Sequence, residues 1–436
     1  MSEIVDYHLL QFFKHKLNET ISISEKLLFK SQFACQTKAG RQLGMEDAVF
    51  LLKSDKKRAL FFGTNHCKSP WICPVCSARV MAKHKKKIDA AIQAMKAKNQ
   101  VAMMITFTIP HNQWYSCEDA IQIVKNSMGQ LMKRAYQQKQ QQKGKKFENN
   151  AWSRMFRSLE FKQYIRAMEF TWGKNGWHPH YHSLFFTPKH KLQLAKDYEE
   201  NLNELWLKIV KQETKKQFYK SKSVKYSKDE INGRVDEIFD RMESKVSCFI
   251  SKNEQGEIAQ MESGAYIAGW GADNELTGSR RKTARAANHF TPMQMLEIAA
   301  GYSQADNLSP EKAWDLFKEF AICTKRNNLH RMKFSSPKGE TLKSIIDKWL
   351  QTNAATEYLK KNYIEKWDVV CWFTKEQWFK ISELNRDIPM LANILYLAYD
   401  SRLLREFLES FEIFAFDNFE HSHQFHVEDI MNGVAA

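Results

Sequence analysis

The feature that most constrains the fold is the stretch from residue 173 to 182, Gly-Lys-Asn-Gly-Trp-His-Pro-His-Tyr-His, in which three histidines occupy alternate positions. Glycine and asparagine at its start are typical of a tight turn between two strands. Residues two apart on a strand lie on the same face, so His178, His180 and His182 all face one way. The pattern predicts a β-hairpin that carries a row of imidazoles on one face.

The position of the turn decides which residue stands opposite the histidines. If residues 174–175 form a two-residue turn, Glu169 on the preceding strand pairs with His180; if residues 175–176 form it, Glu169 pairs with His182. The two registers differ by two residues, so both keep the carboxylate on the histidine face. Imidazoles and a carboxylate that converge in this way can hold a divalent ion and leave coordination positions open for water or substrate.

The hairpin belongs to a longer alternation of strands and helices. Apolar periodicity predicts strands near residues 101–109, 164–172, 177–186 and 245–250, with amphipathic helices after the first and the third of them. Strand, helix, strand, strand, helix, strand is the order of a ferredoxin-like α+β fold with an antiparallel sheet. We expect one face of this sheet to pack under helices and the face with the histidines to be open and polar.

Four of the eight cysteines fall within the first 76 residues. A CxxC spacing allows two thiolates to bind one ion, and two further cysteines nearby could complete a tetrahedral set, with His66 and His84 as substitutes. Chance spacing or a redox pair is the alternative interpretation. We expect a structural zinc ion, Zn²⁺, held by Cys35, Cys67, Cys73 and Cys76.

The charge of the chain points to a polyanionic partner. Lysine and arginine outnumber aspartate and glutamate by 66 to 50, and an aromatic content of 13% favours a folded protein. A helix predicted over residues 78–98 carries a basic face that includes Lys83 and Lys86, which either is simply solvated or contacts DNA phosphates. The sequence shows neither a long apolar run nor a signal peptide, so we expect a cytoplasmic protein without membrane insertion.

A second chemical element is the pair Glu262 and Tyr266. In a helix these residues lie one turn apart on the same face. A tyrosine hydroxyl becomes a nucleophile only with the help of a base or a cation, and a tyrosine by itself is more often a packing residue. Several glycines close to Tyr266 disfavour a helix, so the spacing alone is a weak signal.

The motifs gain meaning from their order along the chain. They are residues 105–111, 168–171, 176–182, 262–266, 270–271 and 274–277, preceded by Cys67, Trp71, Cys73, Pro74 and Cys76 and followed by Thr291, Pro292 and Trp314. This ordered set resembles the rolling-circle plasmid replication initiators (Rep proteins) of the HUH endonuclease superfamily, and the resemblance covers about residues 30 to 340.

The resemblance implies specific roles. His180 and His182 match the paired metal ligands and Glu169 the third, for Mg²⁺ or Mn²⁺. Tyr266 matches the nucleophile that cleaves one DNA strand, leaving a 5′-phosphotyrosyl link and a free 3′-hydroxyl. Glu262 matches a base that activates water at termination, and His178 either orients a ligand or packs. The implied partners are single- and double-stranded DNA at a plasmid origin and the host helicase and polymerase.

The sequence patterns and the resemblance together suggest three regions. Residues 1–100 contain the zinc segment and the basic helix, 101–304 form the endonuclease domain that the resemblance implies, and 305–436 form a mostly helical region. The chain departs from the family at Gly269, where many members carry a lysine, and the cations that could replace it are Arg280, Arg281 and Lys282. A related transposase or mobilisation relaxase is an alternative. A zinc-containing DNA-binding regulator without catalysis is another, but it leaves Glu169, the histidines and Tyr266 unexplained.

Overall fold

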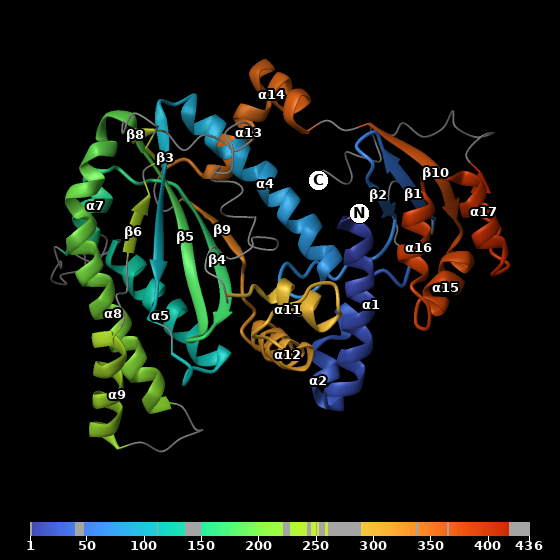
Figure 1. Ribbon diagram of the computed structural model, residues 1–436. Coiled ribbons are helices and arrows are strands. Elements are labelled where there is room, and N and C mark those ends of the chain that lie inside the picture. The colour runs from blue at the N-terminus through green and yellow to red at the C-terminus, as the bar shows by residue number, and fades with distance from the viewer. Residues whose placement is uncertain are drawn as a thin grey trace. The chain divides into compact units, whose positions relative to one another are not determined.

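Figure 1 presents the computed structural model of the chain. The residues that it describes are 2–39, 48–110, 112–135, 150–220, 227–241, 246–249, 251–252, 258–259, 289–336, 339–363 and 366–417. Two compact units are built from interleaved segments: Met1–Lys83, Met295–Asn328 and Leu359–Ala436 form one, and His84–Gln294 and Leu329–Tyr358 form the other. The three consecutive regions expected from the sequence stay a prediction. Among the described helices, none is long and apolar enough to cross a membrane.

The second unit contains a five-stranded antiparallel sheet in the order β6-β3-β5-β4-β9. Without its last strand this is the arrangement of a ferredoxin-like fold, which confirms the order of elements predicted from the sequence. The strands are β3 (Gln100–Thr108), β4 (Tyr164–Gly173), β5 (Gly176–Pro188), β6 (Val246–Phe249) and β9 (Met332–Ser335). A separate short pair joins β7 (Ser251–Lys252) to β8 (Ile258–Ala259).

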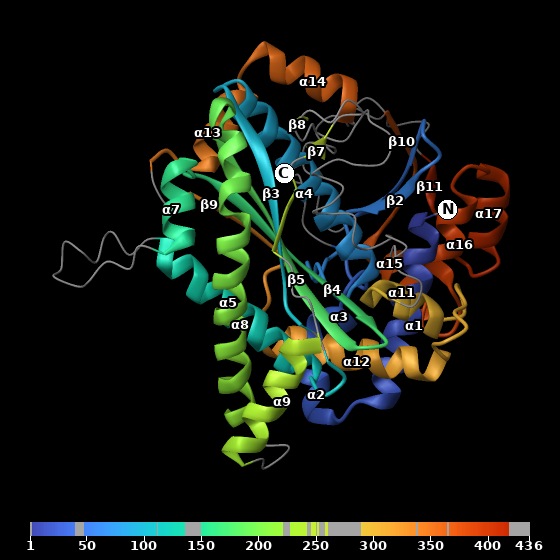
Figure 2. The same cartoon turned by 60° about the vertical axis from the view of Figure 1, so that its left-hand side comes forward.

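One face of the sheet packs on aromatic side chains. Trp152 lies edge-on to Phe107 of β3 and Phe185 of β5, and Phe107 also contacts Trp206. Figures 1 and 2 show the helices that cover this face beside the sheet. They are α5 (Cys117–Ala135), α7 (Ala151–Ser158) and α8 (Glu199–Lys220), with the 3-10 helix η1 (Lys189–Tyr198) before α8 and α9 (Lys228–Arg241) packed against it.

The other face is partly covered by apolar packing, so the expectation of an open and polar face was wrong. Met104, Ala167 and Leu184 lie on it and belong to a buried apolar cluster. The cluster also includes Ile88 of α4 (Pro74–Lys96) and Ile345 of α13 (Leu342–Leu350). The histidines and Glu169 lie on the same face, next to these apolar residues. The metal-ligand candidates are therefore at the edge of the apolar cluster.

The first unit combines helices with a four-stranded antiparallel sheet in the order β11-β10-β1-β2. The strands are β1 (Val49–Ser54), β2 (Ala59–Phe62), β10 (Trp367–Phe373) and β11 (Phe416–Asp417). The helices are α1 (Ser2–Thr20), α2 (Ile23–Leu28), α3 (Lys30–Phe33), α12 (Pro310–Arg326), α15 (Lys375–Leu384), α16 (Met390–Leu397) and α17 (Ser401–Glu409). Helices α4, α11 (Pro292–Ala299) and α14 (Asn353–Tyr363) each have residues in both units. The region after residue 305 is mostly helical as expected, but it also supplies β9, β10 and β11.

Candidate metal centres

The β4–β5 hairpin brings the predicted metal ligands together. Gly173 pairs with Gly176 around a two-residue turn, and Glu169 pairs with His180, which is the first of the two registers that the sequence allowed. Gly176 has a φ of 88°, and a Cβ atom added there would lie 2.7 Å from the carbonyl oxygen of Asn112. Only glycine fits this conformation and this close approach without strain. The turn therefore fixes the register that places the carboxylate among the imidazoles.

Three side-chain atoms converge on one point. The Oε2 atom of Glu169 lies 3.0 Å from Nε2 of His182 and 3.3 Å from Nε2 of His180, and the two Nε2 atoms are 3.1 Å apart. Donors about 2.1 Å from one ion are separated by about 3.0 Å in an octahedral arrangement and about 3.4 Å in a tetrahedral one. The three groups thus fit a single divalent ion, and both geometries leave coordination positions beyond the three protein ligands.

The site is buried and its carboxylate is ionised. Glu169, His180 and His182 are 7%, 9% and 6% exposed. Burial alone would raise the pKa of Glu169, but its hydrogen bonds with His180 and His182 outweigh this effect, so the pKa of Glu169 lies well below its usual range. A negative charge held in this way is a suitable ligand for a hard cation.

A buried arginine lies near this carboxylate, and sequence reasoning missed it. The carbonyl of Arg331 accepts a hydrogen bond of 2.9 Å from the Met168 amide, next to Glu169 on β4. Burial lowers the pKa of Arg331 to about 10, while the charge of Glu169 acts in the opposite direction. The guanidinium therefore stays positive at neutral pH. Arg331 lies one residue before β9, and β9 pairs with β4 although the two strands are about 160 residues apart in the sequence. No local motif reveals such a pairing.

The remaining nitrogen of each imidazole also has a neighbour. Nδ1 of His182 lies 2.9 Å from Oγ1 of Thr106, which pairs with it on β3. Nδ1 of His180 lies 3.4 Å from the backbone carbonyl of His178. The ring of His178 stacks on that of His180, with 5.1 Å between the centroids. The structure therefore places His178 beside the three ligand candidates, in contact with one of them.

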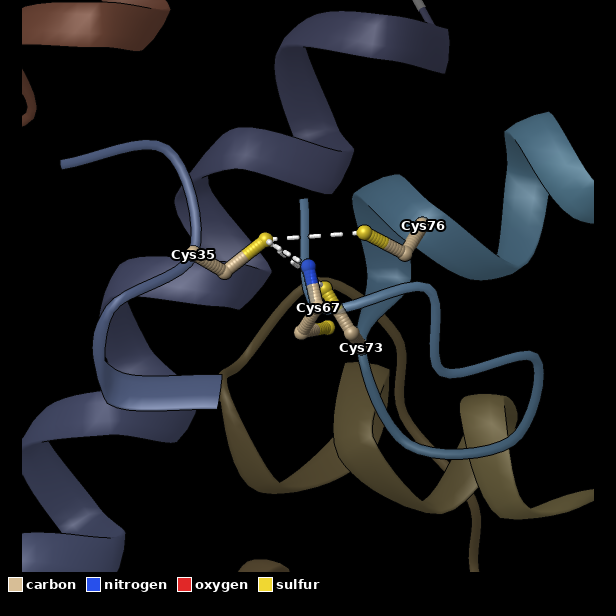
Figure 3. Close-up of side chains that lie close together, drawn as sticks. All are labelled: Cys35, Cys67, Cys73 and Cys76. Atoms are coloured by element: carbon tan, nitrogen blue, oxygen red, sulfur yellow. Dashed lines mark hydrogen bonds between the residues drawn. The ribbon is translucent and has the colours of Figure 1, made fainter. Parts of the chain in front are cut away.

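The second centre is formed by the four predicted cysteines (Figure 3). Cys35 follows α3, Cys67 lies in the segment after β2, and Cys73 and Cys76 flank the start of α4. Sγ of Cys35 lies 3.8 Å from Sγ of Cys73 and 3.5 Å from Sγ of Cys76. Sulfur atoms 2.3 Å from a tetrahedral zinc ion are about 3.8 Å apart, so these distances fit zinc.

The surroundings of the cysteines supply positive charge and hydrogen bonds. Nζ of Lys14 donates to the carbonyl oxygen of Cys35 at 2.6 Å. Hydrogen bonds from the neighbouring thiols lower the pKa of Cys35, whereas burial raises that of Cys73. Of the two substitute ligands, His66 lies with Nδ1 4.0 Å from the sulfur of Cys76, and His84 packs its ring against Phe334. The four sulfurs form the group that suits a metal ion.

The remaining predicted site residues are the nucleophile, its base and the basic residues. Glu262, Tyr266, Arg280, Arg281 and Lys282 lie outside the described residues. Lys83 and Lys86 lie on α4, the first exposed and the second half-buried. The structure thus unites two sets of candidate metal ligands and leaves the roles of the basic and nucleophilic residues as predictions.

Comparison with known proteins shows a distant likeness. A protein named "Protein rep" from Streptomyces lividans is 27% identical to this chain over an alignment of 150 residues, and the match covers 31% of this chain and 32% of that protein. The chain therefore matches about one third of the length of this curated relative. No protein-family model and no solved structure matches the chain.

Proposed function

We propose that this protein is a plasmid rolling-circle replication initiator, which nicks one DNA strand at the origin through a covalent tyrosine link and rejoins it after a round. The observation that carries the proposal is the convergence of Glu169, His180 and His182 on one face of a ferredoxin-like sheet. The distant likeness to the protein named "Protein rep" supports the general class. The ordered motifs support the particular reaction.

Glu169, His180 and His182 would hold Mg²⁺ or Mn²⁺. When bound, such an ion supplies positive charge that neutralises a phosphate oxygen of the DNA. The chain's own contribution is geometric, because the hairpin register keeps the two imidazoles and the carboxylate within hydrogen-bond distance of one another. Burial of all three groups limits competition from bulk water and strengthens their electrostatic interactions.

Tyr266 would supply the nucleophile. Its phenolic oxygen would form a bond to phosphorus and give its proton to water, the bond from phosphorus to the 3′-oxygen would break, and that oxygen would take a proton from water to become the free 3′-hydroxyl. At termination, Glu262 would accept a proton from the water that releases the protein. A cation near the phosphate would come from Arg280, Arg281 or Lys282, since Gly269 cannot supply it.

The cysteine centre would hold structural zinc, because four thiolates close the coordination sphere and leave no position for substrate. Lys83 and Lys86, on the helix that begins beside these cysteines, would contact phosphates of the origin DNA. In this role the protein would act in the cytoplasm with a host helicase and polymerase.

A labelled single-stranded oligonucleotide from the origin of the chain's own replicon tests the proposal. With Mn²⁺ or Mg²⁺ we expect an adduct between protein and DNA that survives SDS and is lost in Tyr266→Phe. Tyr181→Phe is the matched control. Tyr181 lies on β5 on the face opposite the histidines, with its ring against Arg166, so this variant should retain the adduct. An adduct that persists in Tyr266→Phe would assign the nucleophile to another residue.

Two further results separate the alternatives. Glu262→Ala should still nick but fail to release after one round; normal release would refute the role of Glu262. If duplex DNA binds and no origin strand is cut, the non-catalytic regulator is the better explanation. Cleavage confined to a transfer origin or a transposon end would favour the relaxase or the transposase.

A further inference from the structure

The two imidazoles of the candidate metal centre present the same ring nitrogen to Glu169. Nε2 of His180 and Nε2 of His182 lie 3.3 Å and 3.0 Å from Oε2 of the carboxylate. Coordination by Nε2 requires that atom to be unprotonated, and a neutral imidazole carries its one proton on the other nitrogen. Each Nδ1 must therefore be an N–H donor in the metal-bound protein, and each needs an acceptor inside a buried site.

The two acceptors differ in kind. Nδ1 of His180 faces the backbone carbonyl of His178 at 3.4 Å, and a carbonyl oxygen can only accept. Nδ1 of His182 faces the Thr106 hydroxyl at 2.9 Å, and a hydroxyl can accept or donate. Thr106 is 6% exposed and lies directly opposite His182 in the sheet, so water has little room to replace its hydroxyl.

We propose that Thr106 is a positioning residue that adjusts His182 to the presence or absence of the metal ion. The inference rests on the metal binding described under the proposed function. In the ion-free protein, His182 can keep its proton on Nε2 and donate to Glu169, while the Thr106 hydroxyl donates to Nδ1. When Nε2 coordinates, it loses that proton and Nδ1 gains one, so the count is unchanged and the Thr106 hydroxyl becomes the acceptor.

This change of role explains why threonine and not valine suits the position. Valine has nearly the shape of threonine and fits a strand equally well, but it would leave the buried Nδ1–H of metal-bound His182 without an acceptor. Serine keeps the hydroxyl and loses only a methyl group. Threonine, valine and serine at position 106 therefore separate the hydrogen bond from the packing.

The test is a Mn²⁺ titration of the full-length, zinc-loaded protein. Binding is measured by calorimetry and, independently, by the electron paramagnetic resonance signal of free Mn²⁺. We expect Thr106→Val to weaken Mn²⁺ binding by about 10- to 100-fold, and Thr106→Ser to stay within about threefold of the wild type. Ser183→Ala is the matched control, because Ser183 adjoins His182 on β5 and its buried Oγ has no hydrogen-bond partner among the described residues. Its Mn²⁺ affinity should be unchanged.

Melting temperatures of the ion-free variants show whether each is folded. If Thr106→Val melts early, Thr106→Ser still decides the matter, because a loss of affinity in the serine variant equal to that in valine would overturn the inference. Equal Mn²⁺ affinity of Thr106→Val and the wild type would overturn it too, as would an equal loss in Ser183→Ala. Absence of Mn²⁺ binding by the wild type would instead refute the metal role within the proposed function.

Discussion

Replacement of Gly176 by alanine tests whether the hairpin turn determines the architecture around the metal centre. Gly176 adopts a φ of 88°, in the left-handed region. An L-residue in that region costs about 1–2 kcal/mol. A Cβ atom would also lie 2.7 Å from the carbonyl oxygen of Asn112 and 3.1 Å from Cα of Gln113. Both neighbours are backbone atoms, which cannot rotate away as the end of a flexible side chain does.

Relief of this overlap adds about 1–2 kcal/mol, at the lower end of the range for inserted methyl groups. Together the two effects predict a loss of about 2–4 kcal/mol. For a unit of this size each kcal/mol shifts the melting temperature by about 2–4 °C, so the transition should fall by roughly 4–16 °C. Gly176→Asn separates the two causes, since asparagine tolerates a positive φ but keeps the overlapping Cβ atom.

Differential scanning calorimetry of the full chain is the assay, because it can resolve transitions of two units. Gly129→Ala in α5 is the control, since an added Cβ atom there meets nothing within 4 Å. The same chemical change in a helix interior should stabilise by about 0.5–1 kcal/mol. If Gly176→Ala melted at or above the wild-type temperature, the argument that this turn requires glycine would be refuted.

Three other predictions concern charges and ligands. Glu169→Gln keeps the shape of the side chain but removes the buried negative charge. It should weaken Mn²⁺ binding, measured by calorimetry, by more than about 100-fold, which is the largest loss typical for residues that only hydrogen-bond to a metal ligand. Cys73→Ser should lower the zinc content from one ion per chain, measured by atomic absorption, and reduce the melting temperature of the first unit; unchanged zinc would contradict the four-cysteine site. Glu340, bonded to Lys98 and Lys348 at 2.6 Å and 2.7 Å, has its pKa lowered to about 2, chiefly by those hydrogen bonds. Because this pKa is below that of an unfolded glutamate, about 4.3, the stability it contributes is present above pH 4.3 or so and is lost as the pH falls towards 2. The difference in melting temperature between wild type and Glu340→Gln should therefore be constant from pH 7 to about 5 and close below that.

The local parts of the fold could be read from the sequence, and the hairpin shows why. The period of two fixes which residues share a face, and the turn residues leave only two registers, both of which unite Glu169 with the histidines. The structure has the register with Glu169 opposite His180. The cysteine cluster could also be predicted from the sequence, because the CxxC spacing places two thiolates at the start of one helix independently of the rest of the fold.

What the sequence did not reveal depends on distant pairings. Strand β10 pairs with β1 across more than 300 residues, and neither strand carries a local sign of the other. The covering of the histidine face by Ile345 and its helix is of the same kind. Near Glu169 the alternating residues on the histidine face are polar. Farther along the same face, Ala167 and Leu184 are apolar and are buried by packing against other elements. The sequence predicted that Thr106 lies on a strand, but only the pairing of β3 with β5 shows that it lies opposite His182.

The two metal centres differ in the charge that each would carry, and this difference matches the roles proposed for them. One carboxylate and two neutral imidazoles around a divalent ion leave a net charge of about +1, and the buried, protonated Arg331 adds to it. Such a site attracts a phosphodiester. Four thiolates around zinc leave about −2, which Lys14 at the Cys35 carbonyl partly offsets. A site of that charge would repel DNA phosphates. Under the proposed function, the three-ligand set would therefore hold the scissile phosphate, and the closed cysteine set would stabilise the fold.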